Sequence, residues 1–316
     1  MLQSTSHVNQ CRPDGGIRFR AAALGDAVGV HAVILARDVA DLGAPDYTLE
    51  DLRDRWDRSD LHLAVDALIA EADSGQVVAY ADVERRGTFA VVAPEHEGRG
   101  IGTQLLHWAQ ARERERGHQQ HRQFVAANNA RARALLRAAG YLRARSYWRM
   151  ARQLDHSAHV IRPPVGVRLR SLDVDRDATA LHALDAASFA GHPDYQPASL
   201  SAFCDQQLRA DDLDADTSRV AEHGESIIGF VLARRWQTRS IGYLALLAVH
   251  PDHQRHGVGT ALLRTAFTRF AAAGLREAQL AVATDNPRAL RLYEQLGLKS
   301  KFHFDIYERP LSNPSA

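Results

Sequence analysis

The feature that most constrains this chain is an internal repeat. The segments 92–106 and 247–263 share an apolar run, a proline, a glycine-rich loop and the start of an amphipathic helix. One offset relates the two copies, because 251 − 94, 259 − 102 and 297 − 140 all equal 157 for paired prolines and glycines. Upstream, Gly16–Arg20 matches Gly166–Arg170 at an offset of 150. A repeat of this length is the size of a domain, so it predicts one folding unit written twice.

The length of 316 residues also suits two domains, because each half is large enough to bury its own core. The second copy gains about seven residues before its loop, since 157 − 150 is 7. The expected division is a disordered N-terminus (1–15), an N-terminal domain (16–150), a linker (151–165) and a C-terminal domain (166–316).

Composition argues against several classes of protein. A net charge of +1, with 45% hydrophobic and 24% charged residues, gives no overall attraction to nucleic acid or to an acidic membrane. No apolar run approaches the roughly 20 residues of a membrane span, and the polar N-terminus does not resemble a secretory signal. Cys11 and Cys204 make no disulfide framework, so we expect a cytoplasmic protein. We also expect either a monomer or a homodimer. No spacing among the 16 histidines predicts a metal site.

Both copies predict the same order of elements. In the first copy, strands are expected at 17–20, 61–70, 76–83, 88–92 and 124–127, and helices at 26–40, 49–56, after the glycine loop to 117, and at 130–139. In the second copy, strands are expected at 167–170, 217–222, 226–234, 241–249 and 279–284, and helices at 175–187, 200–209, 260–274 and 287–297. Asn286 suits the cap and Pro287 the first position of the last helix. Strands in runs with helices covering the sheet make each domain α+β.

The glycine loop of the second copy is suited to bind phosphate. Gly257 and Gly259 permit a tight turn in which several peptide N–H groups point into one concavity. The following helix adds unpaired N–H groups and the positive end of its dipole, and Arg255 adds a fork of donors. The pattern predicts a phosphate or pyrophosphate ligand, although a strand-turn-helix with two glycines is often only a connection.

Two motifs of the second copy resemble the GNAT acyltransferase superfamily. They are Val249-x-Pro-x-x-Gln-Arg-x-Gly-Val-Gly-x-Ala-Leu-Leu and, 27 residues after Gly259 (286 − 259), Asn286-Pro-x-Ala-x-x-Leu-Tyr-x-x-x-Gly-Leu. The resemblance extends over 16–150 and 166–309. It implies an α+β fold of two tandem GNAT-like domains, each a bent, mostly antiparallel sheet with splayed central strands flanked by helices. It also implies acetyl-CoA as the acyl donor, with its pantetheine arm between those strands.

The resemblance carries roles onto particular residues. Backbone groups of Leu247 and Val249 hold the pantetheine, and Asn286 faces the cofactor arm. Tyr293, two helical turns after Asn286 on the same face, donates a proton to the leaving CoA thiolate; at this spacing a tyrosine can also be a core side chain. The loop that cradles the pyrophosphate consists of Gln254, Arg255, His256, Gly257, Val258, Gly259 and Thr260.

The second copy departs from the family at one catalytic position. Many members carry a glutamate there as general base, and the aligned residue is Tyr243. Three alternatives stay open: Tyr243 orders a water, the amine arrives neutral, or a base comes from elsewhere. The residues considered for that base are His192, Asp205 and Glu222, and His192 and Asp205 are also the candidates for substrate contact.

The first copy departs further, because Leu136 stands at the position of Tyr293 (293 − 157 = 136). We therefore expect an inactive N-terminal domain and a catalytic C-terminal domain. The first copy either holds CoA without turnover or serves packing and the shape of the substrate cleft. Its possible second cofactor site consists of Val92, Gly98, Arg99, Gly100, Ile101, Gly102, Thr103 and Asn129.

The resemblance predicts an N-acetyltransferase that moves the acetyl group of acetyl-CoA directly to a primary amine of a small molecule. The tandem layout and the run Phe189-Ala-Gly-His-Pro193 are also similar to the mycothiol synthases of this superfamily, which acetylate a cysteinyl amine on a glucosaminyl-inositol. Tyr243 stands where those enzymes have their glutamate. A rival from another class is a non-catalytic acyl-CoA-binding sensor, which the missing carboxylate favours and Tyr293 opposes.

Overall fold

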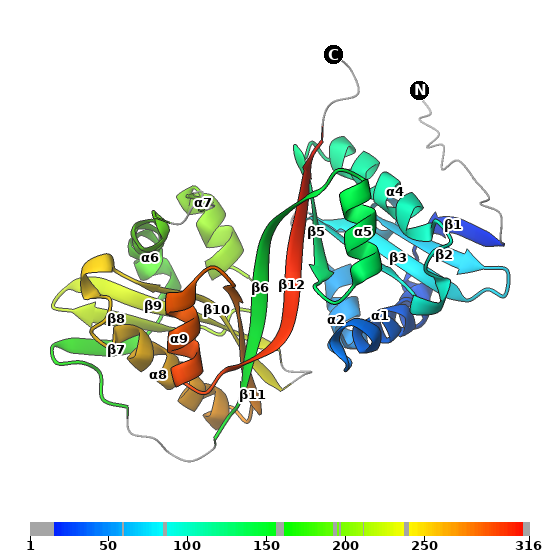
Figure 1. Ribbon diagram of the computed structural model, residues 1–316. Coiled ribbons are helices and arrows are strands. Elements are labelled where there is room, and N and C mark those ends of the chain that lie inside the picture. Colours follow the sequence, from blue (N-terminus) through cyan, green and yellow to red (C-terminus); the bar gives the residue numbers. More distant parts are fainter. Residues whose placement is uncertain are drawn as a thin grey trace. The chain divides into compact units, whose positions relative to one another are not determined.

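The computed structural model describes residues 16–58, 60–84, 87–155, 161–191, 195, 197–210, 212–236 and 240–311, which form two compact units (Figure 1). The first unit contains the chain up to Tyr147 and the segment from Phe302 onward. The second unit contains Trp148–Lys301. The expected disordered N-terminus lies outside the described residues.

The first unit is a mostly antiparallel sheet with helices on both faces (Figure 1). Two apolar cores lie on opposite faces, one beneath α1 and α2 and the other beneath α4, so the sheet is covered on both sides. The strand order is β1 (Ile17–Ala21), β2 (Ala67–Ala72), β3 (Val77–Glu84), β4 (Gly87–Val92), β5 (Gln120–Ala126) and β12 (Lys299–Pro310). The helices are α1 (Ala27–Leu42), α2 (Leu49–Trp56), α3 (Leu63–Asp66), α4 (Ile101–Glu115) and α5 (Ala130–Ala138).

The second unit repeats this arrangement. One core lies beneath α6 and α7, and the other beneath α8 on the opposite face. The strand order is β7 (Val167–Ser171), β8 (Arg219–His223), β9 (Ser226–Trp236), β10 (Ile241–Val249), β11 (Glu277–Ala283) and β6 (Leu142–Gln153). The helices are α6 (Val174–Phe189), α7 (Leu200–Phe203), α8 (Val258–Ala272) and α9 (Pro287–Gln295). The predicted α+β fold in tandem is therefore confirmed.

Each unit is completed by a strand from the other copy of the repeat. In the first unit, β12 pairs antiparallel with β5, from Phe304 opposite Ala126 to Pro310 opposite Gln120. In the second unit, β6 lies beside β11, and the N–H of Leu154 donates to the carbonyl of Arg276 at 2.8 Å just past its end. The compact units thus differ from a division of the chain at the expected linker, 151–165. A division at the linker would assign β6 to the N-terminal domain and β12 to the C-terminal domain.

Local sequence sets the boundaries of the helices that carry the site. The Oδ1 atom of Asn286 accepts from the N–H of Ala289 at 3.0 Å, and Pro287 fills the first helical position of α9. Gly297, just past the end of α9, has a φ of +82°, as a left-handed C-terminal glycine requires. The predicted cap and stop of this helix are confirmed.

Two predicted elements were correct only in part. The expected strand at 61–70 begins only at Ala67, because α3 precedes it: the carboxylate of Asp66 accepts from the N–H of His62 and pairs with Arg112 of α4, which fixes a helical turn. The expected helix at 200–209 is α7 followed by a π-helical turn at Cys204–Leu208. Wide turns of this kind recur at functional sites, and the hydrophobic spacing of the sequence does not distinguish them from an α-helix.

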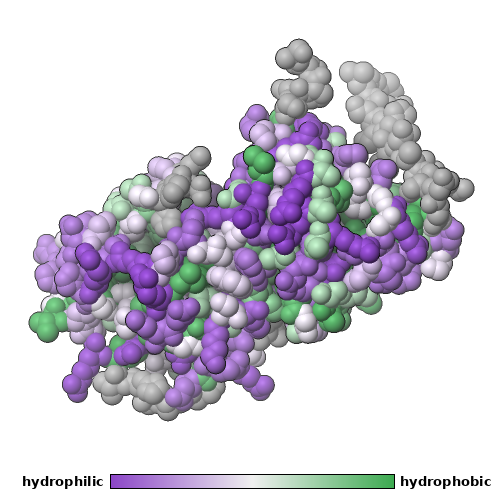
Figure 2. Space-filling view, in the orientation of Figure 1, coloured by the Kyte–Doolittle hydropathy of each residue, from purple (hydrophilic) through white to green (hydrophobic). Residues whose placement is uncertain are grey.

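Hydrophilic side chains cover most of the surface in the view of Figure 2, and apolar residues are scattered among them. This distribution is ordinary for a folded domain. Among the described residues, no helix is both long and apolar enough to cross a membrane.

Candidate active site

The second unit opens between β10 and β11. These parallel strands pair from Ile241 opposite Glu277 to Leu244 opposite Leu280, and the ladder of described residues ends there. At the same point, Ala245 is an extra residue in the pairing of β10 with β9. A bulge of this kind bends its strand away from the regular ladder. Beyond Leu244, the backbone groups of β10 that face β11 therefore have no strand partner among the described residues.

Gly259 faces the space that this opening creates. A Cβ atom at this position would lie 3.6 Å from Cδ2 of Leu292, 3.8 Å from Cγ2 of Val249 and 4.0 Å from Cδ2 of Leu247. These are ordinary contact distances, so the glycine leaves room between three apolar walls. Leu247, Val249 and Leu292 thus surround Gly259 at the start of α8.

The carbonyl of Val249 is already occupied. It accepts from the hydroxyl of Ser188 at 3.1 Å and from Nε2 of Gln254 at 2.9 Å. Gln254 also accepts a hydrogen bond from the guanidinium of Arg288, so its side chain links the loop after β10 to helix α9. Sequence reasoning missed Ser188, whose contact with β10 joins segments 61 residues apart in the chain.

The glycine loop presents unpaired N–H groups at the start of α8. A one-turn 3₁₀ segment at Pro251–His253 leads into the loop, and Gly257 takes the left-handed conformation with a φ of +82°. The first bond of the helix runs from the N–H of Ala261 to the carbonyl of Gly257. The N–H groups of Val258, Gly259 and Thr260 therefore have no acceptor within the helix, which is the arrangement that binds anions.

Arg255 has a strained backbone in this loop. Its φ is +67°, in the left-handed region that L side chains rarely adopt, whereas Gly98 occupies the same position of the first copy (255 − 157 = 98) with a φ of +78°. Placing an arginine there costs about 1–2 kcal/mol relative to glycine. The side chains of Arg255 and His256 are exposed and form no ion pair among the described residues. Strain retained at an exposed, unpaired cation is typical of a ligand-binding loop.

Tyr293 lies on α9 and packs against the core beneath α8. Burial, and secondarily the nearby Tyr243, raises the pKa of Tyr293 to about 12. Its hydroxyl has no hydrogen-bond partner in the part of the chain that the structure describes. The phenol therefore keeps its proton at neutral pH and is free to donate it. At the start of the same helix, Asn286 uses Oδ1 as the cap and leaves its amide nitrogen without a partner among the described residues.

Tyr243 lies at the closed end of the opening. It sits opposite Gln279 on β11, and its phenol takes a hydrogen bond from the backbone of Ala281, the first residue after the ladder ends. Burial raises the pKa of Tyr243, although the charges of Arg149 and Arg234 and the hydrogen bond from Ala281 oppose the rise. A phenol with a raised pKa stays protonated at neutral pH, so Tyr243 is poorly suited to serve as the general base. The structure thus brings Tyr243 and Tyr293 together.

The other sequence candidates for a base lie elsewhere. Asp205 is exposed and pairs with Arg209 at 2.8 Å within one turn. Glu222 is held by Arg168 and Arg170, and these contacts lower the pKa of its carboxyl despite some desolvation. A carboxylate held by two guanidinium groups is a weak proton acceptor. His192 lies outside the described residues.

The first unit has an open cleft at the equivalent place. Pairing of β4 with β5 consists of Thr88 opposite Gln123, and the cleft beyond has a volume of about 710 Å³. Of the residues predicted for a second cofactor site, those that line this cleft are Val92, Gly98, Gly100, Gly102, Thr103 and Asn129. Ile101 is instead a core residue with 1% exposure, and Arg99 is exposed beside the loop.

Two details distinguish this cleft from that of the second unit. Leu136 lines it, 4% exposed, at the position of Tyr293, so this cleft has an apolar side chain where the second unit has a phenol. The amide nitrogen of Asn129 donates to Asp41 at 3.0 Å, whereas that of Asn286 has no partner among the described residues. The first unit therefore has a cleft at the equivalent place, with Leu136 where the second unit has Tyr293.

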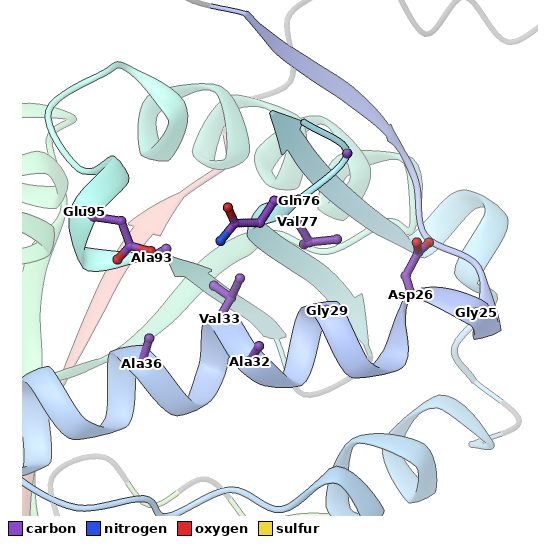
Figure 3. A pocket seen from close by; sticks show the side chains of 11 residues that line it. Gly25, Asp26, Gly29, Ala32, Val33, Ala36, Gln76, Val77, Ala93 and Glu95 are labelled. Atoms are coloured by element: carbon purple, nitrogen blue, oxygen red, sulfur yellow. The ribbon is translucent and has the colours of Figure 1, made fainter. Parts of the chain in front are cut away.

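A smaller hollow of about 310 Å³ lies beside α1 in the first unit (Figure 3). Small residues of the helix, among them Gly29 and Ala32, form one wall, and Gln76 and Val77 face them. Asp26 lines it but is bonded through both oxygens to Arg20. The hollow thus lacks a free catalytic pair. Across the described residues, no group of three or more His, Cys, Asp or Glu side chains is placed to hold a metal ion.

Comparison with protein families gives one match in each unit. The "Acetyltransferase (GNAT) family" matches residues 179–298, and the "Acetyltransferase (GNAT) domain" matches residues 64–143. A mycothiol acetyltransferase of Actinosynnema mirum is 30% identical over 248 residues, which is 76% of this chain and 82% of that protein. A mycothiol acetyltransferase of Thermobispora bispora is 31% identical over 226 residues, covering 69% of this chain and 74% of that protein.

Solved structures share the fold across both units. A GCN5-related N-acetyltransferase from Sphaerobacter thermophilus superposes with a TM-score of 0.83 at 24% identity, covering 96% of this chain and 98% of that one. A tandem GNAT protein from the clavulanic acid biosynthesis pathway superposes with a TM-score of 0.68 at 16% identity, covering 95% and 100%. At these identities the likeness concerns the fold alone.

Proposed function

Because the chain belongs to the GNAT acetyltransferase family, we propose that its C-terminal unit transfers the acetyl group of acetyl-CoA directly to a primary amine of a small molecule. The observation that carries this proposal is the opening between β10 and β11, which has Gly259 at its wall, the anion-binding loop at one end and the tyrosine pair beside it. Family membership makes the chain an N-acetyltransferase; the acyl donor, the site residues and the acceptor are what we propose.

The residues of the second unit fit acetyl-CoA. When bound, this thioester supplies an activated acetyl group and a thiolate leaving group. The N–H groups of Val258, Gly259 and Thr260, with Arg255, hold the pyrophosphate, because an unpaired helix N-terminus and a guanidinium both favour oxyanions. The side chains of Leu247 and Val249 line the path of the arm and exclude water from it. Asn286 has an amide nitrogen free to donate to the arm.

Proton donation is assigned to Tyr293. Its raised pKa keeps the hydroxyl protonated, and the hydroxyl is unbonded among the described residues, so it can give its proton when the sulfur takes up negative charge. Tyr243 stays protonated as well, and we assign it the positioning of groups at the closed end of the opening, close to Tyr293.

We infer that the N-terminal cleft is a second, non-catalytic acyl-CoA site. Its volume and its lining by Gly98, Gly100 and Gly102 support binding, and Leu136 in place of a proton donor argues against turnover. Bound cofactor there stabilises the first unit through mass action, because it binds the folded form alone.

The acceptor is proposed from the curated relatives. Their name, mycothiol acetyltransferase, together with 30% identity over most of both chains, supports a cysteinyl amine carried on a sugar as the acceptor. The absence of a glutamate at Tyr243 leaves the wider class of small primary amines as the alternative. The same absence favours, as a second candidate function, a sensor that binds acyl-CoA without reacting.

One assay separates these functions. Purified chain is mixed with acetyl-CoA and a panel of amines (cysteinyl glycosides, amino acids, polyamines and aminoglycosides), and amide products are quantified by mass spectrometry. We expect turnover with at least one primary amine, and the highest kcat/KM with a cysteinyl glycoside. Binding of acetyl-CoA without product from any amine would favour the sensor, and the absence of binding would contradict both functions.

Replacing the strained Arg255 with glycine, the residue of the first copy, should separate binding from stability. We expect acetyl-CoA affinity to fall about tenfold, the effect of one charged hydrogen bond of about 1.5 kcal/mol, while Tm rises slightly because the left-handed strain is relieved. Calorimetric titration and thermal unfolding measure the two effects. Unchanged affinity for acetyl-CoA would show that Arg255 does not contribute to cofactor binding. A lower Tm would contradict the argument that the backbone of Arg255 is strained.

A further inference from the structure

Helices α1 and α6 are equivalent, and their alignment can be read from shared contacts. The guanidinium of Arg20 binds both oxygens of Asp26, and that of Arg170 binds both oxygens of Asp177. One turn farther on, Nε2 of a histidine contacts a backbone carbonyl just before the next helix, in the pairs His31 with Tyr47 and His182 with Ala198. The offsets are the same: 177 − 26, 182 − 31 and 198 − 47 are each 151.

At one position of this alignment, the second copy has a buried carboxylate where the first copy has an apolar residue. Asp185 corresponds to Ile34 (185 − 151 = 34), which is a core residue with 1% exposure. Asp185 is itself buried, at 9% exposure, among the apolar residues of α6. Its Oδ2 atom accepts from the hydroxyl of Tyr195 at 2.6 Å, and among the described residues no arginine or lysine pairs with it. Tyr195 corresponds to Ala44, so the first copy lacks both partners.

A buried carboxylate without a cationic partner is unfavourable for folding. Burial raises the pKa of Asp185, while the hydrogen bond from Tyr195 and the charge of His182 oppose the rise. Within the described chain, these two residues are the titratable groups that act on this carboxyl. The first copy shows that the fold accepts an apolar residue at this position, which points to a chemical role for the carboxylate rather than a structural one.

The end of α6 is anchored to the strand that carries the cofactor opening. Ser188, three residues after Asp185 and on the same face, donates to the carbonyl of Val249 at the end of β10. In the first copy, the equivalent turn of α1 contributes Arg37, Asp38 and Asp41 to the lining of the open cleft. The last turns of both helices thus border the opening in the sheet.

The two faces of the second sheet carry different groups. Leu246 and Ala248 of β10 pack on the side of α6, and Leu247 and Val249 pack on the side of α8 and α9, as the alternation of a strand requires. Beyond Leu244 the described pairing of β10 with β11 ends, so no ladder of hydrogen bonds closes the sheet between its two faces there.

We propose that Asp185 and Tyr195 form the proton-accepting site for the acceptor amine, approached from the α6 face. This inference rests on the proposed acetyl transfer and supplies the base that the sequence lacks at Tyr243. The phenolic oxygen of Tyr195 accepts a proton from the ammonium group of the acceptor while its own proton passes to Asp185. The nitrogen lone pair then forms the C–N bond to the acetyl carbonyl carbon as the C–S bond breaks, and Tyr293 gives its proton to the thiolate. The nitrogen loses its second proton to water, which leaves the neutral amide. The phenolate of Tyr293 takes a proton back from water, and Asp185 releases the first proton to solvent.

The sign of the pH dependence follows from this role. Asp185 must be ionised to accept a proton, so kcat/KM rises as pH increases through the raised pKa of its carboxyl and then levels off. Stability behaves in the opposite sense. Because folding raises this pKa, the ionised side chain costs stability above the folded pKa, and the cost is absent below the unfolded pKa.

Three variants test the proposal: Asp185→Asn, Asp185→Ile and Tyr195→Phe. The assay uses the panel amine that gives the highest turnover with the wild type. We expect Asp185→Asn and Tyr195→Phe to lower kcat/KM at neutral pH by about 10²-fold. We also expect the fall of kcat/KM at acidic pH to disappear in both variants. Acetyl-CoA affinity, measured by calorimetry, should be unchanged. Asp185→Ile should lose the same activity while its Tm rises near neutral pH, by an amount that shrinks toward acidic pH.

Glu225→Gln, which removes an exposed carboxylate in the β8–β9 turn, is the matched control and should behave as wild type. If Asp185→Asn has the same turnover as the wild type, and its kcat/KM still falls at acidic pH, this inference is wrong. The proposed acetyl transfer is not affected by that result. A wild-type chain inactive with every amine would overturn the acetyl transfer, and this inference with it. Loss of activity together with loss of acetyl-CoA binding would also contradict the proposal, because it would make Asp185 structural.

Discussion

Replacing Tyr293 with phenylalanine is expected to lower kcat by about 10²- to 10⁴-fold while leaving acetyl-CoA affinity nearly unchanged. The hydroxyl matters when charge develops on the sulfur, so its loss is felt in the transition state and not in the ground state. The change removes a single oxygen from a side chain that packs against the core, and that oxygen has no partner among the described residues. The fold should therefore be retained.

Stopped-flow measurement of the transfer step and calorimetric titration check this expectation. Because the pKa of Tyr293 is raised to about 12, the wild-type enzyme should lose no activity through ionisation of this phenol in the neutral range. If the variant had the same kcat as the wild type, Tyr293 would not be the general acid. A fall in affinity as large as the fall in kcat would show that the phenol binds the cofactor instead.

Replacing Gly259 with leucine should strongly reduce acetyl transfer by blocking the cofactor opening. A Cβ atom fits at this position at 3.6–4.0 Å from its neighbours, but the rest of a leucine side chain would occupy the space between Leu247, Val249 and Leu292. Overpacking costs about 1–3 kcal/mol, so we expect acetyl-CoA binding at this site to weaken by up to about 10²-fold. Titration of the variant and assay of the product measure the effect.

Gly102→Leu is the matched control in the first unit. A Cβ atom there would lie 3.1 Å from the flexible end of Leu135, facing the N-terminal cleft. We expect two binding sites in the wild-type chain, loss of the catalytic one in Gly259→Leu, and loss of the other, with turnover retained, in Gly102→Leu. A single site that only Gly259→Leu removes would mean that the N-terminal cleft does not bind cofactor. Retained turnover in Gly259→Leu would contradict the proposed path of the arm.

Features encoded in short stretches of sequence could be predicted. The offset of 157 gave the duplication, and the cap at Asn286 and the glycine after α9 follow from backbone preferences of single residues. The opening of the sheet followed from family resemblance. The structure adds its cause, which is a ladder that ends at Leu244 beside the bulge at Ala245.

Features that depend on distant contacts could not be predicted. The turn of α3 is fixed by the ion pair of Asp66 with Arg112, 46 residues away in the chain. Asp185 was overlooked because a single aspartate in a helix usually faces solvent. The structure shows that it is buried, and its equivalence with Ile34 becomes apparent when α6 is aligned with α1 through the shared arginine and histidine contacts. The offset of 151 there differs from both 150 and 157, so the equivalence with Ile34 is hidden in the sequence.

Because strands β6 and β12 are exchanged between the two copies, neither half of the chain contains every strand of its own unit. A fragment cut at the linker and beginning at residue 166 would carry every residue of the proposed catalytic site and yet lack the strand that lies beside β11. The fragment that precedes it would lack the strand that pairs with β5. Deletion of the N-terminal copy would therefore also remove β6 from the sheet of the second unit. If the N-terminal copy is inactive, as we propose, such dependence lets selection preserve it for its structural contribution alone.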